Sequence, residues 1–466
     1  MRFVPNNLLI WITVLVLVPA ITMLVYGGAF QMIGLVLIIA VVFVAVVDLQ
    51  LSQGRLKNLE LEIPDLNRCT KGREVGVPVT FLNRGPELPW IRFGLAMIPE
   101  FRATNKVIFR VPKIEKDKSR QIEYELLPLK RGQFTMPTGH AETVSSFGFW
   151  LIRRNYEIDI EMRVYPDLSV ERKRLSSLFL RRGNDGSHVV RQVGKGREFE
   201  QLRDYQPGDD YIDVDWKATA RRGVPVTRTY QIERTQEVYV VVDHSRLSAR
   251  ELKVPLDEAE DHELLLNQDS AGGEFSITTQ LERFLHCSLI LASVAERQGD
   301  LFGFVSFSNQ VDRFIRGKNG RDHYNIIRDA LYTLEPEPVA PDFEQLMIAL
   351  RTRLTRRALI VMLVDLSDPL TAEHFYEAIP LISRQHLILV NMVRPEKAHP
   401  LFSKNAVPEN VSDIYESLGG HFQWQDLRET GKKLSHLGVE LGLPDHEELC
   451  AEAVTQYLNV KKRQLI

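Results

Sequence analysis

The N-terminal stretch without any charged residue is the feature that most restricts how this chain can fold. Residues 3–47 contain no Asp, Glu, Lys or Arg. The stretch divides at Tyr26-Gly27-Gly28 into two apolar runs, about 8–26 and 29–47. Each run is near the roughly 20 residues that a helix needs to cross about 30 Å of hydrocarbon. We therefore predict a transmembrane helical hairpin within residues 1–54.

The few charges that flank the two runs predict the orientation of the hairpin. Arg2 precedes the first run, Arg55 and Lys57 follow the second, and the connecting turn carries no charge. The positive-inside rule then places both ends, and the bulk of the chain, in the cytoplasm. Pro19 is expected to cause a local kink in the first span. A cleaved signal peptide is the alternative for the first run, but a second apolar run directly after it is not typical of one.

Residues 55–166 show the alternating pattern of half-buried strands. Examples are the runs Leu59–Ile63, Val77–Phe81 and Ile122–Leu126, which are separated by turn residues. This spacing predicts an antiparallel β-sandwich. Nothing in it indicates catalysis, so we expect a spacer or an interaction module.

Residues 167–236 contain the densest polar signature of the chain. Its clustered carboxylates allow a metal site or an acid/base site. The alternative is structural, because Pro207-Gly208 is turn chemistry and interleaved Arg and Asp can satisfy one another. We favour an ordered, ion-paired segment that packs beside the next domain. The signature residues are Glu198, Arg203, Tyr205, Gly208, Asp209, Asp210, Asp215, Trp216, Lys217 and Arg221.

Residues 237–466 have the pattern of a doubly wound α/β domain. Val238–Val242 reads as a strand that is buried on both faces, and this is typical of a parallel sheet. Short apolar strands and longer helical patterns then alternate along the chain. We predict helices at residues 277–298, 324–334, 343–354 and 371–384, and strands at residues 301–307, 358–364 and 386–392.

Two strands of this domain end in an acid, and ligands of such sheets bind beyond the carboxyl ends of the strands. Asp243 and Ser245 follow the first strand, and Asp365 follows a later one. These hard oxygen ligands suit Mg²⁺, and Asp342 is the fourth candidate ligand. The alternative is that the two acids cap helices and Ser245 pairs with backbone, or that Arg246 or another base neutralises the acids.

Composition excludes several other functions. The net charge of −3 gives no global reason for nucleic-acid binding. The three cysteines are far apart and show no CxxC spacing, so neither a disulfide framework nor a zinc knuckle is supported. The chain contains no GxSxG elbow, HExxH motif or Walker A loop. We therefore expect a protein that is not an enzyme.

The carboxyl-edge residues resemble the metal-ion-dependent adhesion site of von Willebrand factor A domains. The motif Asp-x-Ser-x-Ser of that family follows the first strand, and here Leu247 replaces its last Ser. Asp342 stands where the family usually has a loop Thr.

The chain as a whole resembles the domain-of-unknown-function 58 family. The resemblance rests on the paired N-terminal spans, the signature, the strand that ends Asp-x-Ser-Arg, and Tyr457-Leu458-x-x-Lys461. Two departures are Ile212-Asp213, where the family usually has basic residues, and an insertion at residues 250–274 with eight acids against two basic residues. The insertion could cover or regulate the metal edge.

The resemblance implies a von Willebrand factor A-like adaptor in the bacterial inner membrane. Its expected partner is a MoxR-type AAA+ ATPase that assembles or activates client complexes. Two alternatives remain open: a hydrolase that uses the Asp-rich signature, and a metal-free structural scaffold.

Overall fold

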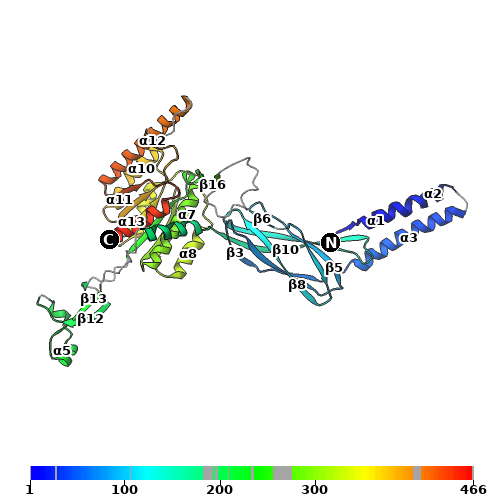
Figure 1. Cartoon of the computed structure of the whole chain (residues 1–466), viewed down its shortest axis with the longest axis horizontal. Coiled ribbons are helices and arrows are strands. Elements are labelled where there is room, and N and C mark those ends of the chain that lie inside the picture. The colour runs from blue at the N-terminus through cyan, green and yellow to red at the C-terminus, as the bar shows by residue number, and fades with distance from the viewer. Residues whose placement is uncertain are drawn as a thin grey trace. The chain divides into compact units, whose positions relative to one another are not determined.

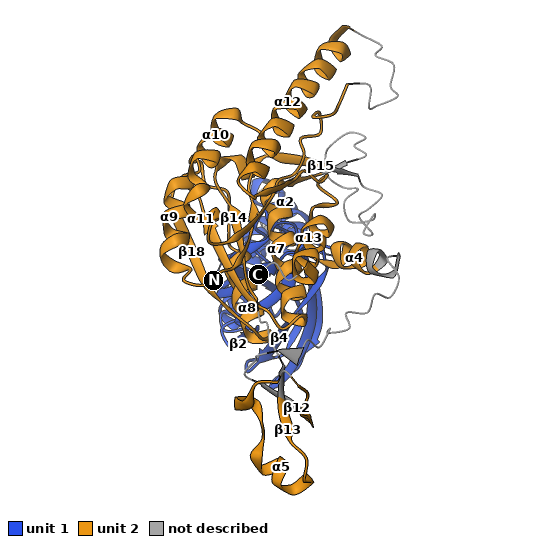
Figure 2. Cartoon of the chain, turned by 90° about the vertical axis from the view of Figure 1, so that its left-hand side faces the viewer, with its two compact units in different colours: residues 1–167, 263–265 blue, residues 168–262, 266–466 orange. Residues whose placement is uncertain are grey.

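The computed structural model describes residues 2–26, 29–104, 106–181, 193–194, 198–207, 209–231, 236–255, 275–401 and 411–463. The chain divides into two compact units, of which the first contains residues 1–167 and the second begins at Leu168 (Figure 2).

Two apolar helical segments open the chain, as the sequence predicts (Figure 1). The segments Asn7–Val25 and Phe30–Ser52 are long and apolar enough to cross a membrane, and 11% of each is buried within the protein. Trp11 and Val25 are 71% and 81% exposed, so these helices are not the core of a water-soluble domain. The elements are α1 (Asn7–Ile12), η1 (Thr13–Leu17), α2 (Val18–Tyr26) and α3 (Ala29–Ser52).

The distortion expected from Pro19 appears one turn before it. Pro19 has no N–H, and its ring would collide with the carbonyl of Leu15 in a regular α-helix. The turn η1, which contains Leu15, is a π-helix. This wider turn accommodates the proline within a continuous helical segment.

Two β-sheets that share one apolar core make up the rest of the first unit. Val77, Val79 and Phe81 of one strand are fully buried and alternate with partly exposed residues, which is the period-two pattern expected from the sequence. The first sheet has the order β1-β10-β9-β5-β7, with β3 paired to β10: β1 (Arg2–Pro5), β10 (Trp150–Tyr165), β9 (Gly132–Val144), β5 (Leu88–Leu95), β7 (Phe109–Ile114) and β3 (Leu66–Thr70). The second has the order β2-β4-β8-β6: β2 (Leu59–Glu62), β4 (Val75–Asn83), β8 (Lys118–Pro128) and β6 (Phe101–Ala103).

Both ends of the helical hairpin are fixed to this β-structure. β1, which precedes the first helix, pairs with β10 in the register Arg2↔Arg153. Near the end of the second helix, the buried Asp48 carboxylate accepts hydrogen bonds from the Ser145 hydroxyl at 2.6 Å and the Phe147 N–H at 2.9 Å. The start of the first helix and the end of the second helix therefore both lie next to the same β-structure.

The strands of the signature segment pair with one another in a small β-sheet. Its three strands have the order β11-β13-β12, and a short helix follows the turn. The elements are β11 (Val193–Gly194), β12 (Glu198–Asp204), η2 (Tyr211–Asp213), α5 (Trp216–Arg222) and β13 (Val226–Gln231).

A six-stranded sheet with helices on both faces forms the core of the second unit (Figure 1). The order is β18-β17-β14-β19-β20-β21, parallel except for the edge strand β18. The strands are β14 (Glu237–Asp243), β17 (Leu301–Phe307), β18 (Val311–Lys318), β19 (Leu359–Leu363), β20 (Leu387–Asn391) and β21 (Glu440–Gly442). One face carries α4 (Ser169–Arg181), α7 (Gln280–Arg297), α8 (Arg321–Leu331) and α13 (Leu449–Arg463), and the other carries α9 (Phe343–Arg353), α10 (Pro369–Ala378), α11 (Pro380–Ser383) and α12 (Val411–His436).

Three predicted helices are wrong in their bounds, and the one predicted at residues 324–334 is α8, which begins and ends three residues earlier, at Arg321 and Leu331. The helix predicted from Ile277 begins at Gln280, because Thr279 caps it by accepting the N–H of Glu282, and β16 (Phe275–Thr279) pairs with β15 (Glu251–Pro255). The helix predicted at residues 371–384 is two helices divided before Pro380, which cannot donate a helical hydrogen bond. Of the acidic insertion, residues 256–274 lie outside the described part of the chain.

Candidate functional site

The candidate site lies at the carboxyl edge of the six-stranded sheet, beyond the ends of β14, β17 and β19. The turn after β14 begins at His244, whose N–H donates to the carbonyl of Phe307 at 3.0 Å. This bond ties the turn to the end of the neighbouring strand.

Asp243 is the most perturbed acid of this edge. Its side chain is fully buried, and its Oδ1 accepts the N–H of Ser245 at 2.8 Å. Its Oδ2 is buried without a hydrogen-bond partner. Burial and, to a smaller extent, the charge of Asp365 together raise the pKa of Asp243 to about 7, although the hydrogen bonds of Ser245 act to lower it. The fold therefore holds a carboxyl oxygen that is free to accept a proton or a cation.

Asp365 makes the same local turn as Asp243 on the next strand. Its Oδ1 accepts the N–H of Ser367 at 2.8 Å, and its side chain is almost fully buried. Arg250 Nη1 lies 3.9 Å from Asp365 Oδ2. Asp365 does not cap the next helix, because Asp368 is the N-cap of α10.

Arg246, the base that we expected to neutralise Asp243 and Asp365, acts on Asp368 instead. Arg246 is exposed. Hydrogen bonds from Thr371 lower the pKa of Asp368, and the charge of Arg246 adds to the effect. Arg250 is thus a base that lies beside one of the two buried acids, Asp365.

The side chains of the other two predicted ligands, Ser245 and Asp342, accept hydrogen bonds from nearby backbone N–H groups. Ser245 is fully buried, and its hydroxyl accepts the N–H of Leu247 at 3.4 Å. Asp342 caps α9 by accepting the N–H of Gln345 at 2.9 Å. Asp342 thus caps a helix, which is the role that the sequence also allowed for Asp243 and Asp365. Its own N–H donates to the Ser308 carbonyl at the carboxyl edge of the sheet.

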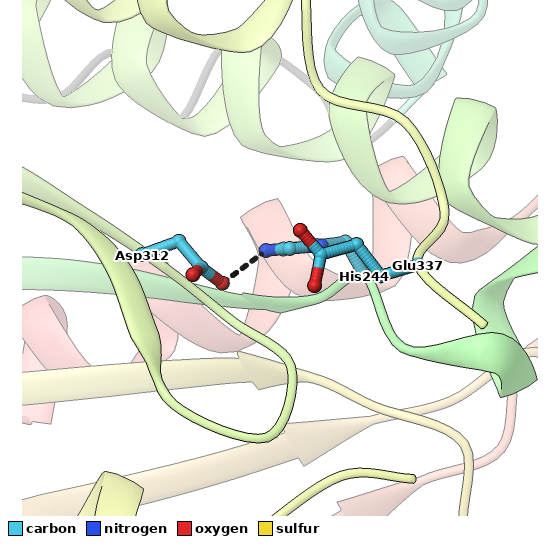
Figure 3. A group of neighbouring side chains, drawn as sticks. All are labelled: His244, Asp312 and Glu337. Atoms are coloured by element: carbon cyan, nitrogen blue, oxygen red, sulfur yellow. Dashed lines mark ion pairs between the residues drawn. The ribbon is translucent and has the colours of Figure 1, made fainter. Parts of the chain in front are cut away.

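A second cluster, which the sequence did not predict, lies next to Asp243. The side chains of His244, Asp312 and Glu337 converge from three segments of the domain (Figure 3). One ligand atom from each lies within 4.8 Å of the other two. The sequence gives little signal for this cluster, because the three residues stand at unrelated spacings.

The signature residues form ion pairs and caps within their own segment. Arg203 pairs with Asp209, and Asp215 pairs with Arg228 at 2.8 Å while it caps α5 by accepting the N–H of Ala218.

The surroundings lower the pKa of two signature acids, Asp209 and Asp215. A hydrogen bond from the backbone of Gln206, together with Arg203, lowers the pKa of Asp209. The backbone of Ala218 and then Arg228 lower the pKa of Asp215. Neither is therefore suited to act as a general acid.

The remaining signature side chains are mostly exposed. The rings of Tyr211 and Trp216 lie 5.1 Å apart at the surface. Among the described residues, the signature acids form no group of three with metal-ligand spacing. The exposed members are Tyr205, Asp210, Trp216, Lys217 and Arg221, whereas Gly208 and the side chain of Glu198 lie outside the described part of the chain.

Two curated relatives match parts of the chain. The uncharacterized protein YeaD of Bacillus subtilis (strain 168) is 26% identical over 155 residues, which are 33% of this chain and 39% of that protein. The uncharacterized protein Rv1480 of Mycobacterium tuberculosis is 42% identical over 60 residues, which are 13% of this chain and 19% of that protein. The chain thus spans well under half the length of the relatives that it matches.

Among solved structures, the conserved hypothetical protein BatB from Bacteroides thetaiotaomicron matches 49% of this chain and 99% of its own. The sequence identity is 14% and the TM-score is 0.27.

A family model matches the part of the chain that contains the signature and the carboxyl edge. The family is described as "Protein of unknown function DUF58", and the matched residues are 201–251 and 245–401. The resemblance predicted from the sequence is therefore confirmed for residues 201–401, the part of the chain that the DUF58 family model matches.

Proposed function

We propose that this protein is a membrane-anchored adaptor with a von Willebrand factor A-like domain that binds a protein partner at its carboxyl edge. The observation that carries the proposal is the buried Asp243 carboxyl group, which has one unpartnered oxygen and lies within the field of Asp365. Two such carboxylates repel each other unless a proton, a cation or a base lies between them.

Mg²⁺ is the cation that this set of ligands favours. Asp243, Ser245 and Asp365 offer only hard oxygens, and Mg²⁺ bound by few protein ligands keeps open positions for water or an incoming carboxylate. An acidic side chain of a partner would complete the coordination. The order of the sheet, with β14 in its interior and the Asp-x-Ser sequence at its end, supports the von Willebrand factor A-like assignment.

The anchoring follows from the hairpin. Because β1 and Asp48 fix both ends to the same β-structure, two crossings would leave the bulk of the protein on one side. The flanking charges favour the cytoplasmic side of the bacterial inner membrane. A partner there would be a MoxR-type AAA+ ATPase, with client complexes as its targets.

We infer a binding role rather than catalysis because Asp209 and Asp215 of the signature are held by ion pairs and backbone hydrogen bonds. The competing function is a metal-free scaffold, and the position of Arg250 at 3.9 Å from Asp365 favours it. In that case Arg250 supplies the positive charge permanently.

Calorimetric titration with Mg²⁺ distinguishes these two functions. The full chain in detergent should release or absorb heat on Mg²⁺ addition, and Asp243→Ala should abolish the signal. Asp322→Ala, an exposed acid in the first turn of α8, is the control and should bind like the unmutated protein.

Capture of the ATPase tests the partner. The unmutated protein and Asp322→Ala should retain a MoxR-type ATPase from solubilised membranes, and Asp243→Ala should not. No heat with the unmutated protein would favour the metal-free scaffold, and equal capture by all three proteins would place the docking surface elsewhere.

A further inference from the structure

The cluster of His244, Asp312 and Glu337 has the spacing of a metal centre. His244 comes from the turn after β14, Asp312 from β18, and Glu337 from the loop between α8 and α9 (Figure 3). One nitrogen or oxygen of each lies within 4.8 Å of the others. Ligands of a four-coordinate Zn²⁺ ion at about 2.0–2.2 Å lie roughly 3.5 Å from one another, so small side-chain rotations let one ion reach all three.

The imidazole of His244 is buried and lies at ion-pair distance from Asp312, but it makes no well-oriented hydrogen bond to any residue that the structure describes. The ring is 2% exposed, and neither ring nitrogen makes a hydrogen bond of suitable geometry among the described residues. Nε2 nevertheless lies 2.7 Å from Asp312 Oδ2. A buried polar group without a hydrogen bond is costly, and a metal ion bound to the nitrogen lone pair removes that cost.

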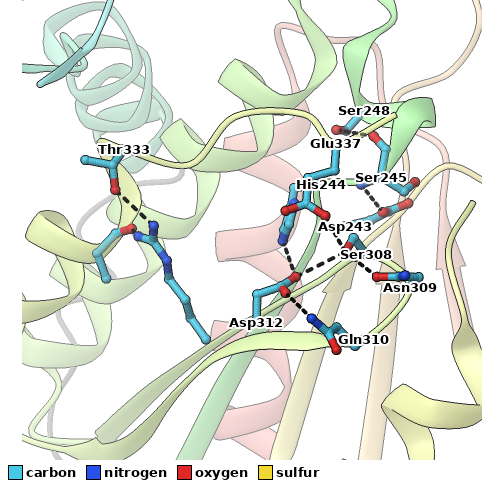
Figure 4. Close-up of polar contacts among 12 residues, drawn as sticks. Asp243, His244, Ser245, Ser248, Ser308, Asn309, Gln310, Asp312, Thr333 and Glu337 are labelled. Carbon is cyan, nitrogen blue, oxygen red and sulfur yellow. Dashed lines mark hydrogen bonds and ion pairs between the residues drawn. The ribbon is translucent and has the colours of Figure 1, made fainter. Parts of the chain in front are cut away.

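Two carboxylates share one hydroxyl group beside this ring (Figure 4). The Ser308 hydroxyl lies 2.9 Å from Glu337 Oε2 and 3.1 Å from Asp312 Oδ2. A hydroxyl has one proton, so it can donate to only one of the two acids at a time. Within the described part of the chain, Glu337 has no basic side chain at ion-pair distance. The negative charge of the cluster therefore favours a bound cation.

The backbone holds these side chains in place before any ion binds. The Glu337 N–H donates to the His244 carbonyl at 2.7 Å. Pro338 disfavours the helical region for Glu337, and Pro336 on the other side of Glu337 has a fixed φ of its own. The loop is thus ordered along the turn that contains His244, and little entropy remains to be lost on metal binding.

We propose that His244, Asp312 and Glu337 bind a divalent transition-metal ion of the Zn²⁺ type. The imidazole nitrogen decides the class of ion, because Mg²⁺ prefers oxygen ligands whereas Zn²⁺ readily accepts imidazole and carboxylate together. Three protein ligands leave one position open. Since Asp312 and Glu337 are solvent-exposed residues, that position can take water or a group of a partner protein.

Co²⁺ is the probe for this site, because its visible absorption reports nitrogen and oxygen ligation at a Zn²⁺ position. The full chain in detergent, stripped with a chelator, should bind one Co²⁺ that Zn²⁺ displaces and excess Mg²⁺ does not. Glu337→Gln and His244→Gln should each weaken binding by at least about 100-fold, since even residues that only support metal ligands change affinity by 10–100-fold.

Matched controls separate this site from other binding. His374→Gln on α10 and Glu344→Gln on α9 replace exposed residues and should leave Co²⁺ binding unchanged. Glu337→Gln is the decisive variant, because a surface substitution of the same shape is not expected to unfold the protein.

The proposal is refuted if the unmutated chain binds no Co²⁺, or if Glu337→Gln and His244→Gln bind it as the unmutated chain does. Asp365→Asn distinguishes this site from the proposed Mg²⁺ site, because it should lose Mg²⁺ and keep Co²⁺. Loss of Co²⁺ in Asp365→Asn, with retention in Glu337→Gln, would assign the ion to the other acids.

Discussion

Asp243→Asn is expected to stabilise the folded protein at alkaline pH when no divalent cation is present. Burial and the charge of Asp365 raise the pKa of this carboxyl from 3.8 to about 7. The difference is about three pH units, and each is worth about 1.4 kcal/mol. Asparagine keeps the acceptor for the Ser245 N–H and removes the charge. The folded state should therefore gain about 4 kcal/mol at pH 8.

The gain in stability from Asp243→Asn depends on pH. Below about pH 4 the carboxyl is protonated in both the folded and the unfolded chain, so it costs nothing. Between about pH 4 and 7 the unfolded chain ionises while folded Asp243 stays protonated, and the stability of the unmutated protein falls. Above pH 7 the cost is constant. The advantage of Asp243→Asn should thus be about 1.5 kcal/mol at pH 5 and about 4 kcal/mol at pH 8.

Thermal unfolding of the full chain in detergent with a chelator measures this. About 4 kcal/mol corresponds to a rise in Tm of very roughly 10 °C for a domain of this size. Asp368→Asn is the control, because Asn caps helices as well as Asp does and the change should be small at both pH values. A lower Tm for Asp243→Asn at pH 8, or an equal gain at pH 5 and pH 8, would refute the reasoning.

Three further predictions concern other parts of the chain. Burial raises the pKa of Glu171, but the hydrogen bond and charge of His286 and the charge of Arg283 lower it to about 2. Glu171→Gln should therefore lower the free energy of unfolding by about 3 kcal/mol at pH 7 and by little near pH 2, as measured by denaturant unfolding. Asp215→Ala should speed hydrogen exchange in α5, whereas Lys217→Ala should not, because only Asp215 caps that helix. Carbonate should fail to extract the protein from membranes, and residues 55–466 should resist protease in spheroplasts but not in inverted vesicles; digestion in spheroplasts would contradict the proposed topology.

The sequence by itself was sufficient for the features that local patterns encode. Residues 3–47 lack charge, and a long apolar run of this kind has few stable structures other than membrane helices. The apolar run Val238–Val242 predicted a strand buried on both faces, and β14 is the second interior strand of the sheet from its β18 edge. The Asp and Ser residues that follow these strands were also visible, because strand ends define where side chains gather.

Only the tertiary structure decided which of these side chains have partners. Asp342, Asp365 and Asp243 are equivalent as sequence letters, yet one caps a helix, one lies near Arg250 and one has an unpartnered oxygen. Burial raises the pKa of Asp243, and that burial depends on how the surrounding elements of the domain pack.

The His244 cluster shows the same limit more sharply. Asp312 and Glu337 stand 68 and 93 residues after His244, and no local period relates such positions. Their meeting depends on the antiparallel turn between β17 and β18 and on the bond from the Glu337 N–H to the His244 carbonyl. Contacts of this kind arise from the packing of whole elements, which is why the sequence pattern predicted the edge of the sheet but not the side chains that meet there.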